Sequence, residues 1–314
     1  ENIPLATDKL LPLLSKILPS YTQNPEPLAD LSIKILRPMD FTQTLTIVSD
    51  ENLILALQSP LLSAKLLGIN ILSKASSSPS HTAALSALKS VVAALIRTWL
   101  SSPEVEVGEA ATRVLGDLLE VDCECRKSFS SGLISRIKDL NLELEIPSGQ
   151  GLLWRRIFHD QDIYKLLFSL TGECTSDSEE CRLDKRQRTL AQGRLLRLLP
   201  RLSVLNFQMI TQSHFPLIEQ LYGNDASGLL PFAMINMVDK KDLLMHITLI
   251  IFFGELLSLM SRTTLSPSAL ALLSSHIKKA ASNDFSLKDS LETTASDPRT
   301  PPELLDLLSR LAIA

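Results

Sequence analysis

A chain of 314 residues can bury a large core, and a net charge of −4 excludes a global polycation that binds nucleic acid through its charge alone. Only 5% of the residues are aromatic, and apolar residues recur at helical spacing nearly everywhere, with little strand-like alternation. Four cysteines are too few for a disulfide scaffold of this size, so we expect a reducing, cytoplasmic or nuclear setting. These totals favour an all-α protein, and an elongated helical solenoid is the natural arrangement.

Helical periodicity, prolines and polar breaks divide the chain into roughly eighteen helices, which would make eight or nine helical pairs. We expect a single continuous α-solenoid over residues 1–314, with an internal break at 141–150 and an exposed loop at 171–182. The first eight predicted helices cover residues 5–18, 27–36, 41–48, 51–57, 60–75, 83–100, 102–121 and 126–140. Two more lie within 151–170 and meet near 159–160. The others cover residues 183–199, 204–211, 215–222, 229–237, 241–260, 267–282 and 302–312, and Pro200 divides the first two of these.

The most regular stretch is SPEVEVGEAATRVLGDLLEV, residues 102–121. Ser102 is the expected helix cap and Pro103 the expected first helical residue, and small residues such as Gly116 allow a neighbouring helix to approach closely. Parts of this pattern return: the sequences KLLG, ending at Gly68, and GELL, beginning at Gly254, echo RVLG and GDLL. The spacing from Gly68 to Gly116 is 48 residues and that from Gly116 to Gly254 is 138, three times 46. This period is typical of HEAT and armadillo arrays, and it predicts a solenoid of that type.

Motifs of phosphate-binding loops, serine hydrolases, zinc proteases and calcium-binding loops do not occur in the sequence. The five histidines are scattered, and we interpret them as ordinary surface or core residues. Cys123 and Cys125, and Cys174 and Cys181, form two pairs that lack the CxxC spacing of zinc sites, so ordinary thiols are the simpler interpretation. We therefore expect a protein that is not an enzyme and that has no cofactor and no metal site.

The most apolar run is LLMHITLIIFFGELLSLM, residues 243–260. Its length is marginal for a membrane span, and His246 and Glu255 interrupt it. We interpret it as a helix buried between neighbouring helices, and we expect no contact with a membrane.

Two charged regions bear on partners. Residues 101–145 contain ten acidic and five basic residues, among them Glu109, Asp117 and Glu120 on the regular helix. They form either a solvated face or a contact surface for a basic partner.

The second charged region, residues 182–201, contains arginines that share about a third of a helical circumference. Its stripe fits a solvated face, an acidic protein contact or nucleic acid, but direct nucleic-acid binding is not expected because no aromatic residues are interleaved. The arginines of this stripe are Arg182, Arg186, Arg194 and Arg197.

A third candidate combines tryptophan, arginine and tyrosine, the residue types that dominate binding hot spots, at a junction between two predicted helices. Alternatively, the tryptophan fills the core between two repeats, and Arg155 and Asp160 form a local ion pair. The candidate partner-binding residues here are Trp154, Arg155, Arg156, Asp160, Asp162 and Tyr164.

Three runs, SPEVEVGEAATRVLGDLLEVD, GLLWRRIFHDQDIYKLLFSLT and GLLPFAMINMVDKKDLL, resemble the fungal HEAT-repeat chaperones of 26S proteasome base assembly. Fungal members of that family are also catalogued as DNA mismatch repair proteins. The resemblance spans most of the chain and implies a C-shaped α-solenoid without catalytic residues. Such a chaperone holds the C-terminal domain of one proteasomal AAA ATPase subunit, promotes assembly of the 19S regulatory-particle base with other base subunits, and leaves before the mature particle forms.

With this resemblance, we expect the acidic residues Glu109, Asp117 and Glu120, near the Trp154 junction, to receive a basic ATPase domain. Two other functions stay open at this point. One is a generic HEAT-repeat scaffold or adaptor that binds short peptides or another class of partner. The other is a DNA-repair factor with direct nucleic-acid contact, which would bind in a strongly salt-dependent way through the arginine stripe of residues 182–201.

Overall fold

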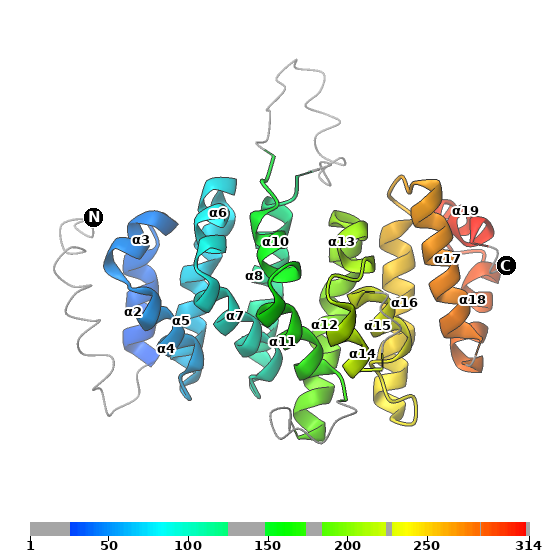
Figure 1. The fold of residues 1–314 in the computed structure, drawn as a ribbon, viewed down its shortest axis with the longest axis horizontal. Coiled ribbons are helices and arrows are strands. Elements are labelled where there is room, and N and C mark those ends of the chain that lie inside the picture. Colours follow the sequence, from blue (N-terminus) through cyan, green and yellow to red (C-terminus); the bar gives the residue numbers. More distant parts are fainter. Residues whose placement is uncertain (1–25, 125–147, 174–183, 224–227, 283, 312–314) are drawn as a thin grey trace, which may run out of the picture. The chain divides into compact units, whose positions relative to one another are not determined.

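The computed structural model describes residues 26–124, 148–173, 184–223, 228–282 and 284–311. Within these residues every regular element is a helix, with seventeen α-helices and one short 3-10 helix (Figure 1). The all-α class predicted from helical periodicity is therefore confirmed. The helices predicted at 5–18 and 126–140, most of the break at 141–150 and most of the loop at 171–182 lie outside the described residues.

In chain order the helices are α2 (Glu26–Leu36), α3 (Phe41–Ile47), α4 (Asp50–Gln58), α5 (Leu62–Ser73), η2 (Lys74–Ser77), α6 (Pro79–Ala87), α7 (Lys89–Ser101), α8 (Val105–Val121), α10 (Leu152–Phe158), α11 (Gln161–Thr171), α12 (Lys185–Leu205), α13 (Phe207–Thr211), α14 (Pro216–Leu221), α15 (Leu229–Ile235), α16 (Leu243–Met260), α17 (Pro267–Ala281), α18 (Phe285–Ser296) and α19 (Pro302–Arg310).

The described helices group into two compact units. The first comprises the residues up to Val92 together with Asp117–Arg156. In it, α5 packs against α2, α3 and α4. The Lys74 ammonium, at the end of α5, donates hydrogen bonds of 2.8 and 2.7 Å to the carbonyl oxygens of Leu36 and Met39. These bonds connect the end of α5 to backbone carbonyl groups at and just after the end of α2.

The second unit comprises Ala93–Gly116 and the residues from Ile157 onward. Its longest helix, α12, lies side by side with α16 and also contacts α11, α13 and α15, and α15 contacts α17 (Figure 1). Large apolar side chains such as Phe168, Phe232 and Phe253 fill its core. The prediction of a single continuous domain stays a prediction.

Two helix boundaries differ from the prediction. The break predicted at Pro200 lies at Asn206 instead, because α12 continues through Pro200 to Leu205 and a separate short helix, α13, follows from Phe207. Proline removes one backbone hydrogen bond from a helix, but Pro200 is buried together with Leu198 and Leu199, and this packing holds the helix together. Conversely, the single helix predicted over 83–100 is two helices separated at Leu88, where the apolar spacing continues without a proline or glycine to mark the break.

The start of α8 and the existence of α18 also differ from the prediction. Helix α8 begins at Val105, not at Pro103. The guanidinium of Arg194 binds the carbonyl oxygens of Ser102 and Glu104, which holds this stretch outside the helix. Helix α18 was not predicted because its sequence, FSLKDSLETTAS, has few apolar residues, and only two of its side chains, both leucines, are buried.

Candidate functional site

The acidic side chains of α8 lie on one side of the helix. Glu109, Asp117 and Glu120 are spaced by eight and three residues, which places them on one helical face, and all three are partly exposed. The opposite face, with residues such as Leu115, is buried. The Glu109 carboxylate forms an ion pair with Arg197 of α12, and both Asp117 and Glu120 also have interactions within the chain. Arg113 is exposed on the same face, so positive charge is interspersed with these acids.

The four arginines that the sequence places on one stripe have different surroundings in the structure. Arg194 is only 9% exposed. Its guanidinium donates hydrogen bonds of 2.8, 2.7 and 2.9 Å to the carbonyl oxygens of Trp99, Ser102 and Glu104. Arg194 therefore fastens α12 to the end of α7 and cannot contact a nucleic acid. Arg197 is paired with an acid, Arg186 is exposed, and Arg182 lies outside the described residues.

Trp154 belongs to the core and is not an exposed hot spot. Its side chain is 1% exposed, and its indole N–H donates a 2.9 Å hydrogen bond to the carbonyl oxygen of Leu119. Trp154 belongs to α10. The carboxylate of Asp122 caps the start of α10 by accepting hydrogen bonds from the backbone N–H groups of Leu152, Leu153 and Trp154, at 3.2, 2.7 and 3.1 Å. Burial raises the pKa of Asp122, although these three donors act in the opposite direction. The prediction that Trp154 binds a partner is corrected in favour of the core interpretation.

Tyr164 is also a core residue, and its predicted partner contact is corrected for the same reason. Its hydroxyl donates a 2.8 Å hydrogen bond to the buried carboxylate of Glu219, which also accepts a 2.9 Å bond from the backbone N–H of Gly228. Burial and the neighbouring Glu219 raise the pKa of Tyr164 well above its usual range, so the phenol stays a neutral donor. The Glu219 carboxylate thereby connects Tyr164 of α11 to Gly228, the residue before α15. Both side chains of the Tyr164–Glu219 pair are buried, so a partner cannot reach them.

The remaining predicted residues of this junction lie at or near the surface. The guanidinium of Arg155 pairs with the Glu124 carboxylate at 3.4 Å, and the Arg156 guanidinium donates a 2.8 Å bond to a backbone carbonyl of α6. Asp160 caps α11 by accepting a 3.1 Å hydrogen bond from the N–H of Asp162, which is itself exposed. The structure thus places Arg155 and Asp162 where a partner can reach them, whereas Asp160 has a capping role.

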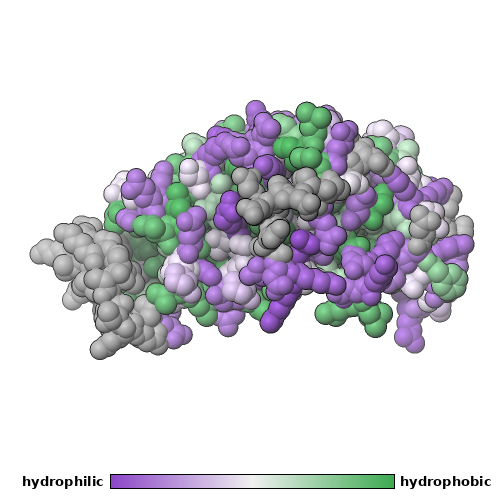
Figure 2. Space-filling view, turned by 60° about the horizontal axis from the view of Figure 1, so that its bottom comes forward, coloured by the Kyte–Doolittle hydropathy of each residue, from purple (hydrophilic) through white to green (hydrophobic). Residues whose placement is uncertain are grey.

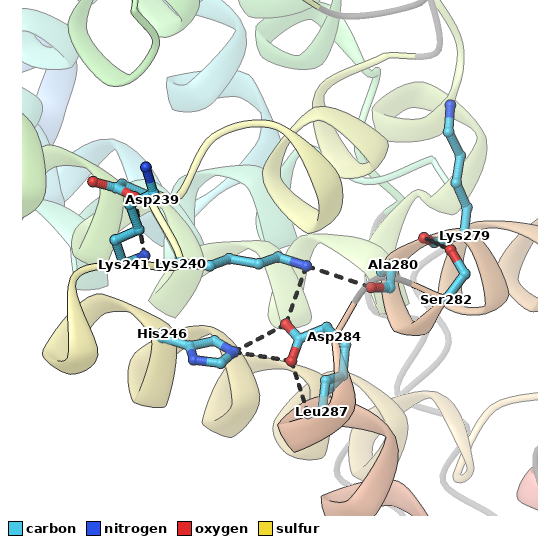
Figure 3. Close-up of polar contacts among 9 residues, drawn as sticks. All are labelled: Asp239, Lys240, Lys241, His246, Lys279, Ala280, Ser282, Asp284 and Leu287. Atoms are coloured by element: carbon cyan, nitrogen blue, oxygen red, sulfur yellow. Dashed lines mark hydrogen bonds and ion pairs between the residues drawn. The ribbon is translucent and has the colours of Figure 1, made fainter.

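Sequence reasoning missed a polar cluster around the nearly buried carboxylate of Asp284 (Figure 3). The ammonium of Lys240 lies 3.0 Å from one of its oxygens, and His246 Nε2 lies 3.0 and 2.9 Å from its two oxygens. The same carboxylate caps α18 by accepting a 3.0 Å bond from the backbone N–H of Leu287. The Lys240 ammonium also reaches the carbonyl oxygen of Ala280 at 3.4 Å. These residues are far apart in the chain, so no local pattern could have revealed the cluster.

The polar contacts of the Asp284 cluster hold three helices together. Burial alone would raise the pKa of Asp284, but the Leu287 N–H, the Lys240 ammonium and the His246 ring outweigh it and hold the pKa below its usual range. The Asp284 carboxylate thereby connects the start of α16 to the start of α18, and the Lys240 ammonium connects this carboxylate to the end of α17. No set of three or more side chains suited to holding a metal ion occurs among the described residues.

Helix α16 is the single helix among the described residues that is long and apolar enough to span a membrane by length and composition. One side of it is buried, including Phe252 and Leu256, as predicted. The other side is exposed, which the prediction of a helix buried between neighbours did not include.

Comparison of the chain with protein-family models and with curated proteins finds no match.

Proposed function

We propose that this chain is a non-catalytic α-solenoid of the HEAT or armadillo type that binds another protein. Its specific role, in this proposal, is that of a cytoplasmic or nuclear assembly chaperone for the C-terminal domain of one proteasomal AAA ATPase subunit. Two points support the proposal. The resemblance of three runs of sequence suggests the partner class, and the acidic face of α8 supplies a surface on which a basic domain could bind.

The acidic face of α8 is the observation that carries the proposal. Its three carboxylates are partly exposed on a helix whose opposite side is buried. The exposed Arg113 lies among them on the same side of the helix, and Glu109 pairs with Arg197 of α12. The excess of acids on the helix face attracts a basic surface and speeds its association, and salt weakens both effects. Successive helices of a solenoid would extend this surface without forming a deep pocket.

The test is a binding assay against the purified C-terminal domains of all six proteasomal ATPase subunits, with duplex DNA as a further probe. We expect one domain to bind tightly and DNA not to bind. In the double variant Asp117→Lys and Glu120→Lys, the affinity for that domain should fall tenfold or more at low salt. The difference should shrink as the salt concentration rises.

Asp289→Lys, an exposed charge reversal on α18, is the matched control and should leave the affinity unchanged. If no ATPase domain binds, the chaperone role is wrong and a general scaffold remains. If one domain binds but the double reversal has no effect, the partner is right and the assigned surface is wrong.

A further inference from the structure

Helix α16 exposes a stripe of large apolar side chains. Leu243 and Leu244 are 71% and 73% exposed, and Ile247 and Ile251 are 45% and 55% exposed. Residues 243, 247 and 251 are four apart and lie on one side of the helix, and the stripe ends at Gly254. At 1.5 Å per residue, the stripe from 243 to 254 is about 17 Å long. We call Leu243, Leu244, Ile247 and Ile251 the α16 stripe.

Such a stripe is unusual on a helix that already has a complete buried side. Single exposed leucines are common on protein surfaces, but several in a row on one helix mark a contact surface or an aggregation hazard. The side facing the interior already buries Leu249, Phe252, Phe253 and Leu256, so core packing does not require the stripe. Figure 2 shows apolar side chains reaching the surface in several places on one face, with hydrophilic side chains between them.

The neighbouring helix α12 supplies positive charge. Its sequence, KRQRTLAQGRLLRLLPRLSVL, has six basic residues and no acidic one. Arg186, Gly193 and Arg197 are spaced by seven and four residues and line one side of the helix, where both arginines are exposed. Since α12 and α16 lie side by side and both bury the side that faces the interior, their outer sides form neighbouring parts of one surface.

Two glycines on this surface have open space beside them among the described residues. A Cβ atom built at Gly193 or at Gly254 meets no atom of the described residues within 4 Å. By contrast, a Cβ at Gly108 or Gly116 would collide with an arginine side chain of α12. Glycine weakens a helix interior relative to alanine. A glycine that faces open space on each of two adjacent helices allows another backbone to approach closely.

We propose that the outer sides of α12 and α16 bind one amphipathic helix of a protein partner. About three turns of that helix match the length of the α16 stripe. Its apolar residues, three and four apart, pack on the α16 stripe, as in other complexes that hold a helix in a groove. Acidic residues along one edge of the partner helix face Arg186 of α12 and compete with Glu109 of α8 for the exposed Arg197.

Both signs of charge border the α16 stripe. Glu255, exposed beside Gly254 at its end, repels an anionic bilayer, whereas the exposed arginines of α12 attract one. An anionic lipid surface has one sign of charge, whereas a peptide helix can match both signs. A peptide helix accommodates this carboxylate by placing a neutral or basic residue at that end, while keeping its acidic residues next to α12. The proposal concerns the α12 and α16 surface alone and holds whichever protein supplies the helix.

The test uses two synthetic helical peptides of fourteen residues with identical leucine positions three and four apart. One has glutamate along the flanking edge and the other has lysine there. We expect the glutamate peptide to bind the full chain at least tenfold more tightly than the lysine peptide. Ile247→Glu, in the middle of the α16 stripe, should weaken its binding at least tenfold, and Arg186→Glu should abolish the preference for glutamate.

Leu217→Glu is the matched control, because Leu217 of α14 is a highly exposed apolar residue outside this surface, and it should bind as the wild type does. All variants alter exposed side chains, and circular dichroism checks that they fold. Equal binding of the two peptides, or no binding of either, overturns the proposal. Ile247-dependent binding to vesicles of phosphatidylserine and phosphatidylcholine, without peptide binding, overturns it in favour of a membrane.

This outcome is separable from that of the proposed function. If no ATPase domain binds but the glutamate peptide binds in an Ile247-dependent manner, the chaperone role fails and the α12 and α16 surface stands. If an ATPase domain binds and neither peptide does, the reverse holds.

Discussion

Gly108 of α8 and Arg194 of α12 make a pair whose coupling can be measured. An ideal Cβ at Gly108 would lie 2.1 Å from Nε of Arg194, far inside van der Waals contact. That guanidinium is held by three hydrogen bonds to the carbonyl oxygens of Trp99, Ser102 and Glu104. Gly108→Ala must therefore displace a side chain that has little freedom to move, and the cost of the substitution should depend on Arg194.

The magnitude follows from these contacts. A hydrogen bond contributes about 1 kcal/mol net to folding, so losing all three costs about 3 kcal/mol. Alanine in place of glycine in a helix returns about 1 kcal/mol. Gly108→Ala should thus lower the free energy of unfolding by about 2 kcal/mol. In the Arg194→Ala background the collision is gone, and the same substitution should raise it by about 1 kcal/mol.

Urea unfolding, followed by circular dichroism and by tryptophan fluorescence, measures the four free energies of this double-mutant cycle. The reversal of sign is the expected result. Gly254→Ala is the control: its Cβ faces open space among the described residues, so it should stabilise both backgrounds alike by about 1 kcal/mol. Additive effects of Gly108→Ala and Arg194→Ala would refute the close contact on which the argument rests.

Three further predictions concern buried polar groups. Asp284→Asn keeps a helix cap but removes the charge. The folded-state pKa of Asp284 lies below the ordinary value of 3.8. The charged carboxylate therefore stabilises the fold above that pH, and this stabilisation is lost as the pH falls through the folded-state pKa. The wild type should therefore be more stable than the variant near pH 7, and urea midpoints should converge on acidification. Tyr164→Phe removes one donor from the buried Glu219 carboxylate and should lower the unfolding free energy by about 2 kcal/mol in urea titrations. Trp154→Phe should cost about 1 kcal/mol through the lost bond to Leu119, yet leave the affinity for any bound ATPase domain unchanged; a loss of affinity without a loss of stability would restore Trp154 as a contact residue.

Most helices could be predicted because their signals are local. Apolar spacing and caps such as Ser266, followed by a proline, mark their starts directly in the sequence. Where tertiary packing decides, local signals mislead. Pro200 should end a helix, but burial on α12 overrides its penalty, and α18 forms from a polar sequence because Asp284 caps it and joins it to α16.

The candidate site was less predictable than the fold, because the residue types that form binding hot spots also form cores. Trp154 and Tyr164 are buried, and nothing in their immediate sequence distinguishes the two roles. Arg194 is bound by carbonyl groups about ninety residues earlier in the chain, a contact that helical spacing cannot reveal. That Glu109, Asp117 and Glu120 belong to one helix could be predicted, since that inference needs only the period of a single helix.

The echo between GDLL in α8 and GELL in α16 shows how one sequence pattern can have two structural outcomes. Over Gly116 of α8 lies the side chain of Arg201, which comes from the neighbouring helix α12. Over Gly254 of α16 no described atom lies within 4 Å, although α18 packs on α16. Helix α18 has 12 residues against 21 in α12, and it contains no arginine that could lie over Gly254 as Arg201 of α12 lies over Gly116. At Gly116 the space beside the glycine is occupied by a side chain of the same protein, so folding explains the glycine. Gly254 lies beside the exposed α16 stripe with open space around it among the described residues, so binding of a partner explains it better.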